Sequence, residues 1–151
     1  MKRSEALIPL SHDHHHALFV SKLLRDAAEG KDDTAKAVDA FEDYWVKEGI
    51  LHFRVEEEVL LPNSGLEGPS ADEDVAKMLD GHLEIRRLGG RVLGGDTSPE
   101  ALMDLGTSLF DHVRFEERDL FPRIEGSLGE AELENLARLI ADAEKAGESG
   151  D

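Results

Sequence analysis

The sequence contains two histidine–glutamate pairs whose spacing could bring metal ligands together. His52 is followed four residues later by Glu56, and His112 is followed at the same distance by Glu116. On a helix, side chains four residues apart lie on one face, about one turn from each other. Both pairs fall within apolar stripes, where an isolated carboxylate is costly to bury unless it is paired, protonated or bound to a metal. We therefore predict that each pair contributes one imidazole and one carboxylate to a buried polar site.

The two pairs belong to a longer internal repeat. Residues 52–62 align with residues 112–122 at an offset of 60 without a gap, and six of the eleven positions are identical. The shared residues are histidine, arginine, two glutamates, leucine and proline, in the same order. We interpret the repeat as a duplicated helical hairpin. A pseudo-twofold axis would then bring the two copies face to face.

Other histidines extend this set of possible ligands. His82 is the only histidine in the predicted helix over residues 71–93, whereas the predicted helix over residues 11–29 carries His12, His14, His15 and His16. Each long helix thus supplies at least one imidazole, and four imidazoles with two bridging carboxylates could hold two metal ions. This donor mixture suits iron, manganese or zinc better than calcium, which prefers oxygen alone. The spacing differs from the Glu-x-x-His motif of ferritin-like di-iron bundles.

The choice among the clustered histidines depends on which helix face each one occupies. His14 shares a face with Ala17, Ser21 and Leu24, which are small or apolar and leave room for a metal. His16 also lies on an apolar face, whereas His15 points toward charged residues. His14 is our first candidate, with His16, His12 and His15 as alternatives.

The glutamate after each pair has two possible roles. Glu57 and Glu117 recur at equivalent positions of the repeat. They could hydrogen-bond near the site, or they could be solvated partners of Arg54 and Arg114.

Hydrophobic residues recur at steps of three and four along most of the chain, which predicts helices rather than strands. We expect four long helices over about residues 11–29, 32–62, 71–93 and 98–124, and a short fifth helix over about residues 128–146. Their expected starts are Ser11, Asp32 or Asp33, Ala71, Ser98 before Pro99, and a capping box over Ser127–Glu130. Their expected ends are Gly30, Pro62, Gly94–Gly95 and Gly126. The predicted fold class is all-α: an up-down-up-down four-helix bundle with a short extra C-terminal helix, in one domain over residues 1–151.

Composition excludes several classes of partner. The 151 residues include 34 Asp and Glu against 17 Lys and Arg, which gives a formal net charge of −17. Nucleic acids and anionic membranes are therefore unsuitable partners. The chain has no cysteine, which excludes disulfides and thiolate ligands. Because no long apolar run or signal-peptide pattern is evident, we expect a cytoplasmic protein. We expect it to be either a monomer or a homodimer.

The order of these motifs resembles the hemerythrin-like, or histidine-histidine-glutamate cation-binding, domain over about residues 10–125. That pattern is one histidine, a His-x-x-x-Glu motif, another histidine and a second His-x-x-x-Glu motif. The resemblance implies a four-helix bundle around two non-haem iron ions with an oxo or hydroxo bridge. In the implied site Glu56 and Glu116 bridge the irons, His52 and a first-helix histidine hold one iron, and His82 and His112 hold the other. The family usually has an acidic residue directly before its first ligand, which favours His14 after Asp13.

One position departs from the dioxygen-carrying members of that family. They have a fifth histidine four residues after the third-helix ligand, where this chain has Arg86. Two under-coordinated irons would favour redox chemistry or sensing over reversible oxygen carriage. The function that the resemblance implies is handling or sensing of dioxygen, nitric oxide, peroxide or iron. The alternatives are a di-iron enzyme that disproportionates peroxide or acts as an oxidase, and a structural bundle that binds metal incidentally.

Overall fold

The structure is a computed structural model that describes residues 2–149, which fold into helices and connecting loops without a β-strand. The helical elements are α1 (Ile8–Ala28), α2 (Thr34–Tyr44), η1 (Trp45–Gly49), α3 (Ile50–Val55), η2 (Glu56–Leu60), η3 (Leu61–Asn63), α4 (Glu73–Leu93), α5 (Pro99–Phe115), η4 (Glu116–Leu120), α6 (Phe121–Ser127) and α7 (Glu130–Ser149). Residues 34–63 and 99–127 are each helical throughout, and we call these two continuous segments, together with α1 and α4, the four rods. The prediction of an all-helical fold is confirmed.

The first rod starts earlier than the sequence suggested. Leu7 is the N-cap of α1, and Pro9 lies in the first turn, where its missing N–H group is not needed. Ser11 therefore lies inside the helix, and its hydroxyl donates a hydrogen bond of 2.7 Å to the carboxylate of Glu117. The prediction that Ser11 caps this helix is wrong. Gly30 follows the helix with a φ of 76°, which confirms the predicted left-handed stop.

The starts of the second and third rods are set by aspartate caps. The carboxylate of Asp33 accepts a hydrogen bond from the backbone N–H of Lys36, as predicted. Asp72 caps α4 by accepting from the N–H groups of Asp74 and Val75, so this helix begins slightly later than expected. An aspartate carboxylate satisfies N–H groups that have no partner within the first turn of a helix.

The fourth rod begins as predicted but ends later. The hydroxyl of Ser98 accepts from the N–H of Ala101 at 3.2 Å, and Pro99 follows in the first turn. Gly126 does not break the rod, because it lies inside α6. A single exposed glycine costs a helix only about 1 kcal/mol relative to alanine, which neighbouring contacts can offset.

The last helix, α7, starts and ends slightly later than the predicted short helix and is capped differently. The hydroxyl of Ser127 donates to the backbone carbonyls of Ser64 and Ile124, so it is not the N-cap of a capping box. Instead, the carboxylate of Glu132 accepts from the backbone N–H of Gly129 at 3.0 Å. Here the acceptor is a side chain inside the helix that reaches back to a backbone N–H at the start of the helix, as the glutamate of a capping box does.

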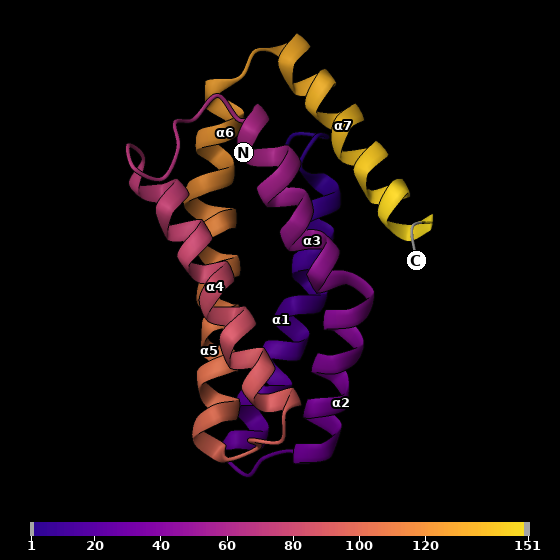
Figure 1. Cartoon of the computed structure of the whole chain (residues 1–151), viewed down its shortest axis with the longest axis vertical. Helices are drawn as coiled ribbons and strands as arrows, with labels where there is room; N and C mark the ends of the chain where they lie inside the picture. Colours follow the sequence, from indigo (N-terminus) through magenta and orange to yellow (C-terminus); the bar gives the residue numbers. More distant parts are fainter. Residues whose placement is uncertain (1, 150–151) are drawn as a thin grey trace.

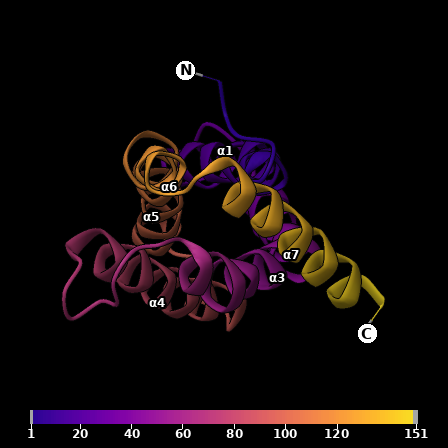
Figure 2. The same ribbon diagram turned by 90° about the horizontal axis from the view of Figure 1, so that it is seen from above.

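The four rods lie side by side, and α7 crosses one end obliquely (Figure 1). Seen from that end, α1, α3, α4 and α5 surround a common interior, and α7 runs obliquely from the end of α6 across α3 (Figure 2). None of the helices within residues 2–149 combines the length and apolar character needed to cross a lipid bilayer.

Two clusters of buried apolar side chains fill the interior. One cluster includes Ala17 and Ile85, and the other includes Leu10 and Met78. Along α1 and α4 these residues lie on opposite sides of a buried histidine, so each rod passes from one apolar cluster to the other at that point. The polar site described next lies at this junction.

Candidate metal centre

The structure brings all six predicted site residues together in the interior. Their exposed fractions are 4% for His14, 3% for His52, 7% for His112 and 0% for Glu56, His82 and Glu116. They form two overlapping groups of ligand atoms, each with its atoms within 4.8 Å of one another. The first group is His14, His52, Glu56 and Glu116, and the second is Glu56, His82, His112 and Glu116. The two carboxylates are common to both groups.

The alternative histidines of α1 lie elsewhere. His12 and His15 are exposed. The side chain of His16 is 38% exposed, and its Nδ1 contacts the carboxylate of Glu48. Of the clustered histidines, His14 is thus the one whose ring reaches the other site residues.

A local change of helix type accompanies each site glutamate. Glu56 begins the π-helical turn η2, in which its carbonyl accepts from the N–H of Leu61. Glu116 begins the equivalent turn η4, in which its carbonyl accepts from the N–H of Phe121. Single π-helical turns inside α-helices occur frequently at functional sites. The internal repeat of the sequence therefore has a counterpart in the backbone.

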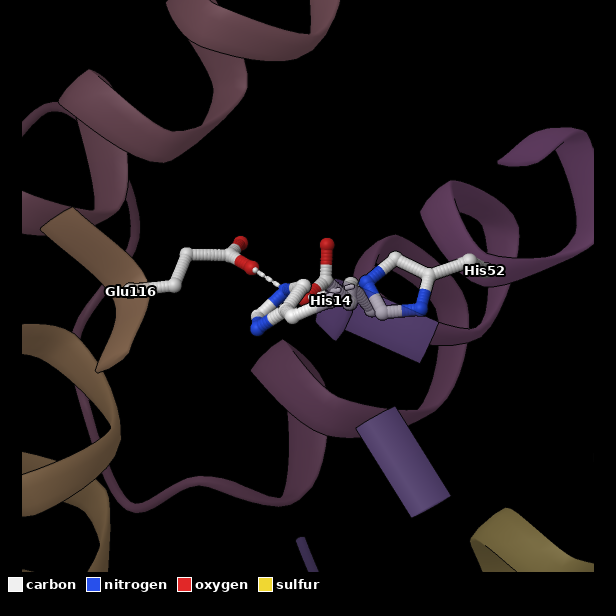
Figure 3. Close-up of side chains that lie close together, drawn as sticks. His14, His52 and Glu116 are labelled. Atoms are coloured by element: carbon white, nitrogen blue, oxygen red, sulfur yellow. Dashed lines mark hydrogen bonds and ion pairs between the residues drawn. The ribbon is translucent and has the colours of Figure 1, made fainter. Parts of the chain in front are cut away.

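Each buried glutamate lies between a histidine of its own rod and a histidine of another rod. Oε1 of Glu116 is 2.9 Å from Nε2 of His14, and Oε2 is 3.1 Å from Nε2 of His112. Figure 3 shows His14 between Glu116 and His52. Glu56 repeats the arrangement, with 2.9 Å to Nε2 of His82 and 3.2 Å to Nε2 of His52. The donor atoms of all four rods therefore converge.

Four of the converging atoms have no hydrogen-bond partner although they are buried. They are Nε2 of His52, Oε2 of Glu56, Nε2 of His112 and Oε2 of Glu116. Buried polar atoms are normally paired, and leaving one unpaired costs about 1–3 kcal/mol. Metal ions bound among these atoms would satisfy all four. The residues present therefore fit the metal ions that the sequence resemblance implies.

In three of the four imidazoles, a carboxylate contacts Nδ1, the ring nitrogen that faces away from the centre. Nδ1 of His14 is 2.6 Å from Glu117, Nδ1 of His82 is 2.6 Å from Glu57, and Nδ1 of His52 is 2.9 Å from Asp13. Histidines that bind metals usually have such a partner on the other ring nitrogen, because it fixes the tautomer and the orientation of the ring. The three rings are thus oriented with Nε2 toward the centre.

The arginine partners predicted for the outer glutamates are wrong. Glu57 pairs with Arg86, whose guanidinium nitrogens lie 2.8 and 3.2 Å from its carboxylate, and Arg54 pairs with Glu58 instead. Glu117 contacts Arg3 at 3.3 Å rather than pairing with Arg114. The alternative prediction, that these glutamates hydrogen-bond near the site, matches the structure.

Sequence reasoning missed several of these outer contacts. Neither the hydrogen bond that Asp13 accepts from His52 nor the ion pair between Arg86 and Glu57 was expected. The recurrence of Glu57 and Glu117 in the repeat was the available signal, whereas the contacts of Asp13 and Arg86 depend on which rods are neighbours.

Without a metal, the site carries closely paired charges of both signs. Burial opposes protonation of His14 and His82, but hydrogen bonds to glutamates outweigh it and raise the pKa to about 9 for His14 and about 10 for His82. His52 follows the same pattern, with a pKa well above its usual value. Burial tends to raise the pKa of Glu116, yet the surrounding histidines hold it well below its usual range. A metal must displace protons from these imidazoles.

Aromatic rings cover two of the histidines. Phe53 stacks on His82 with a centroid distance of 3.9 Å and an interplanar angle of 7°. Phe121 stacks on His14 at 5.5 Å and 19°. These rings restrict the imidazoles from one side and help to keep water from the centre.

Comparison with known families identifies one match. The model of the hemerythrin HHE cation binding domain matches residues 7–124, a range that contains all six site residues. No curated protein and no solved structure matches the chain.

Proposed function

The chain belongs to the hemerythrin HHE cation-binding domain family, and we propose that its buried site binds two iron ions. The observation that supports this proposal is the set of four buried atoms without a hydrogen-bond partner on His52, Glu56, His112 and Glu116. They come from different rods and lie within two overlapping ligand groups. Such polar atoms would only destabilise a hydrophobic core, whereas two bound metal ions would give each of them a partner.

The donor set supports two ions rather than one. Each group contains two imidazoles, and both groups share the carboxylates of Glu56 and Glu116. One ion would have His14 and His52 as nitrogen ligands, and the other would have His82 and His112. Imidazole with carboxylate suits iron, manganese and zinc, and the family match favours iron among them.

We propose that the protein handles or senses a small molecule, namely dioxygen, nitric oxide or peroxide. Bound iron would supply open positions for such a ligand and the capacity to exchange electrons with it. The chain itself orients the imidazoles through Glu57, Glu117 and Asp13 and excludes water with aromatic rings. Arg86 occupies the position of the additional histidine of oxygen carriers, and its contact with Glu57 fits a role in orienting His82 rather than in reversible carriage.

The same proposal includes the topology of the fold. We infer that the four rods form an up-down-up-down bundle within a single domain. The short connections over residues 29–33, 64–72 and 94–98 support this topology, because each joins rods that lie side by side.

The first test is a metal count with spectroscopy. The protein is purified from iron-supplemented cells, iron per chain is measured, and absorption spectra are recorded without oxygen, with oxygen and with peroxide. Two irons per chain with a charge-transfer spectrum support the proposal, and zero or one iron refutes a dinuclear centre. Rapid peroxide loss with oxygen evolution would indicate the enzymatic alternative.

Variants of the bridging residues sharpen this test. Glu56→Gln and Glu116→Gln should each lower the iron content and remove the spectrum. Glu58→Gln is the matched control, because Glu58 lies in the same π-helical turn but its side chain is 59% exposed. Full iron content and an unchanged spectrum in either bridging variant would refute the assignment.

A further inference from the structure

A cavity lies directly beside one of the six site residues. It has a volume of about 600 Å³, lies between α4 and the fourth rod, and is lined by residues that include Gly81, Glu84, Ser108 and His112. His112 is the most exposed of the six site residues. The cavity and the candidate centre therefore share a side chain.

The corresponding corner of the other half of the molecule is filled. Between the second and fourth rods, an offset of 60 residues makes His52 equivalent to His112 and Glu48 equivalent to Ser108. Between α1 and α4, an offset of 68 residues makes Asp13 equivalent to Gly81 and His16 equivalent to Glu84. In the first half, Asp13 contacts Nδ1 of His52 at 2.9 Å, and His16 contacts Glu48. The carboxylate of Asp13 thus covers the outer nitrogen of His52, whose exposed fraction is 3%.

In the second half, the equivalent positions 81 and 108 carry smaller residues, and both line the cavity. Glycine replaces aspartate at position 81, and serine replaces glutamate at position 108. A Cβ atom at Gly81 would lie 2.5 Å from Nδ1 of His112, so only glycine allows α4 to lie this close to the ring. The described residues place a backbone, rather than a carboxylate, against Nδ1 of His112. The pseudo-symmetry of the site is thus broken at its outer face.

We propose that this cavity is the access route by which a small uncharged molecule reaches the centre, on the His112 side. This inference rests on the proposed function, because it assumes that ligand binds at the clustered residues. The other imidazoles are covered: Phe53 stacks on His82, Phe121 stacks on His14, and Asp13 covers His52. The route is therefore one-sided, and it favours ligand approach to the ion held by His82 and His112.

The charges on the cavity wall indicate the class of molecule. Its carboxylates come from Asp80, Glu84, Asp111 and Asp119, and its cations come from Lys77, Arg114 and Arg118. Neither sign of charge dominates, so the wall does not select an anion or a cation. A small neutral molecule needs no charged partner to pass through such a cavity, and nitric oxide is a convenient probe of this kind.

The test uses substitutions that narrow the cavity and leave the six site residues unchanged. Ser108→Phe places a ring in the cavity from α5, and Glu84→Phe does so from α4, so each variant supports the other if one fails to fold. Thr107→Phe is the matched control, because Thr107 is exposed on the same helix and does not line the cavity. Iron content, the equilibrium spectrum and the association rate of nitric oxide, measured by anaerobic stopped flow, are compared with those of the unmodified protein.

We expect Ser108→Phe and Glu84→Phe to keep the iron content and spectrum but to slow nitric oxide association about tenfold, equivalent to about 1.4 kcal/mol in the barrier. Thr107→Phe should keep the original rate. Unchanged rates in both cavity variants, or equal slowing in Thr107→Phe, would overturn the access route while leaving the proposed function intact. Absence of iron from the unmodified protein would refute the proposed function instead.

Discussion

The contact between Glu57 and His82 offers a direct test of how the outer carboxylates support metal binding. Oε2 of Glu57 lies 2.6 Å from Nδ1 of His82, and Arg86 binds the same carboxylate from the other side. The substitution Glu57→Gln keeps the shape of the side chain and an oxygen acceptor but removes the charge. We expect it to weaken binding of the ion held by His82 while leaving the fold unchanged.

The magnitude follows from the environment of the carboxylate. The hydrogen bond from His82 is the largest influence, and together with Arg86 it lowers the pKa of Glu57 from 4.5 to about 2. Because the carboxylate is 25% exposed and therefore partly screened by water, the corresponding interaction is at most about 3 kcal/mol. Arg86 contributes part of this interaction energy. The positive charge of His82 contributes another part, which is lost when a metal ion replaces the proton of the imidazole. We therefore expect a loss of about 10- to 100-fold in iron affinity, the usual effect of removing such a partner.

Competition between the protein and a chelator of known affinity, under anaerobic conditions, measures this loss. The control is Glu58→Gln, whose carboxylate is largely exposed and pairs with the exposed Arg54, so its effect on affinity should be negligible. Arg86→Met is a second comparison, and we expect a smaller loss because Glu57 keeps its bond to His82. Unchanged affinity in Glu57→Gln, or an equal loss in Glu58→Gln, would refute the reasoning.

Further predictions concern pH and packing. Because burial is outweighed by hydrogen bonds that raise the pKa of His14 to about 9 and that of His82 to about 10, iron must displace protons, and its apparent affinity should increase from pH 6.5 to about 9. Calorimetry in two buffers of different ionisation enthalpy should detect proton release, and a pH-independent affinity would contradict this prediction. The metal-free protein should behave in the opposite way: the stabilising effect of both histidines is fully present below pH 6.5 and is lost as the pH rises through about 9 and about 10, so urea unfolding should require less denaturant at high pH. Phe53→Ala should reduce the free energy of unfolding by about 3–5 kcal/mol, as measured by urea denaturation, because this buried ring packs on His82; a change below 1 kcal/mol would show that the stacking is not needed for stability. Ser98→Ala should cost about 1 kcal/mol in the same assay through loss of the α5 cap, whereas an unchanged midpoint would argue against the cap.

The helical periodicity and the site histidines could be predicted from the sequence because both depend on local spacing. His14 was preferred because its helix face was small and apolar, and the structure buries this ring among the other site residues. Asp33 and Ser98 were recognised as caps because a cap acts on the N–H groups of its own first turn. These inferences required no knowledge of how the rods pack.

Features that depend on neighbouring rods could not be predicted in the same way. Ser11 has the residue type of a cap, but its hydroxyl bonds to Glu117, more than a hundred positions away in the sequence. Arg86 faces Glu57 on a different rod, and its role was therefore not visible in either segment alone. Gly126 does not end its helix, since the intrinsic preference of one glycine is weak compared with tertiary packing.

The π-helical turns also change the direction in which the side chains after each site glutamate point. A π-helical turn contains one more residue than the α-helical turn it replaces, so it is equivalent to a single-residue insertion. Glu56–Leu60 and Glu116–Leu120 start at the same position of a repeat that aligns without a gap. The residues after each of these turns are therefore displaced by one position around the helix, and the displacement is the same in both copies. This shared displacement keeps the two site glutamates in equivalent settings, whereas the turn over Trp45–Gly49 has no equivalent within α5.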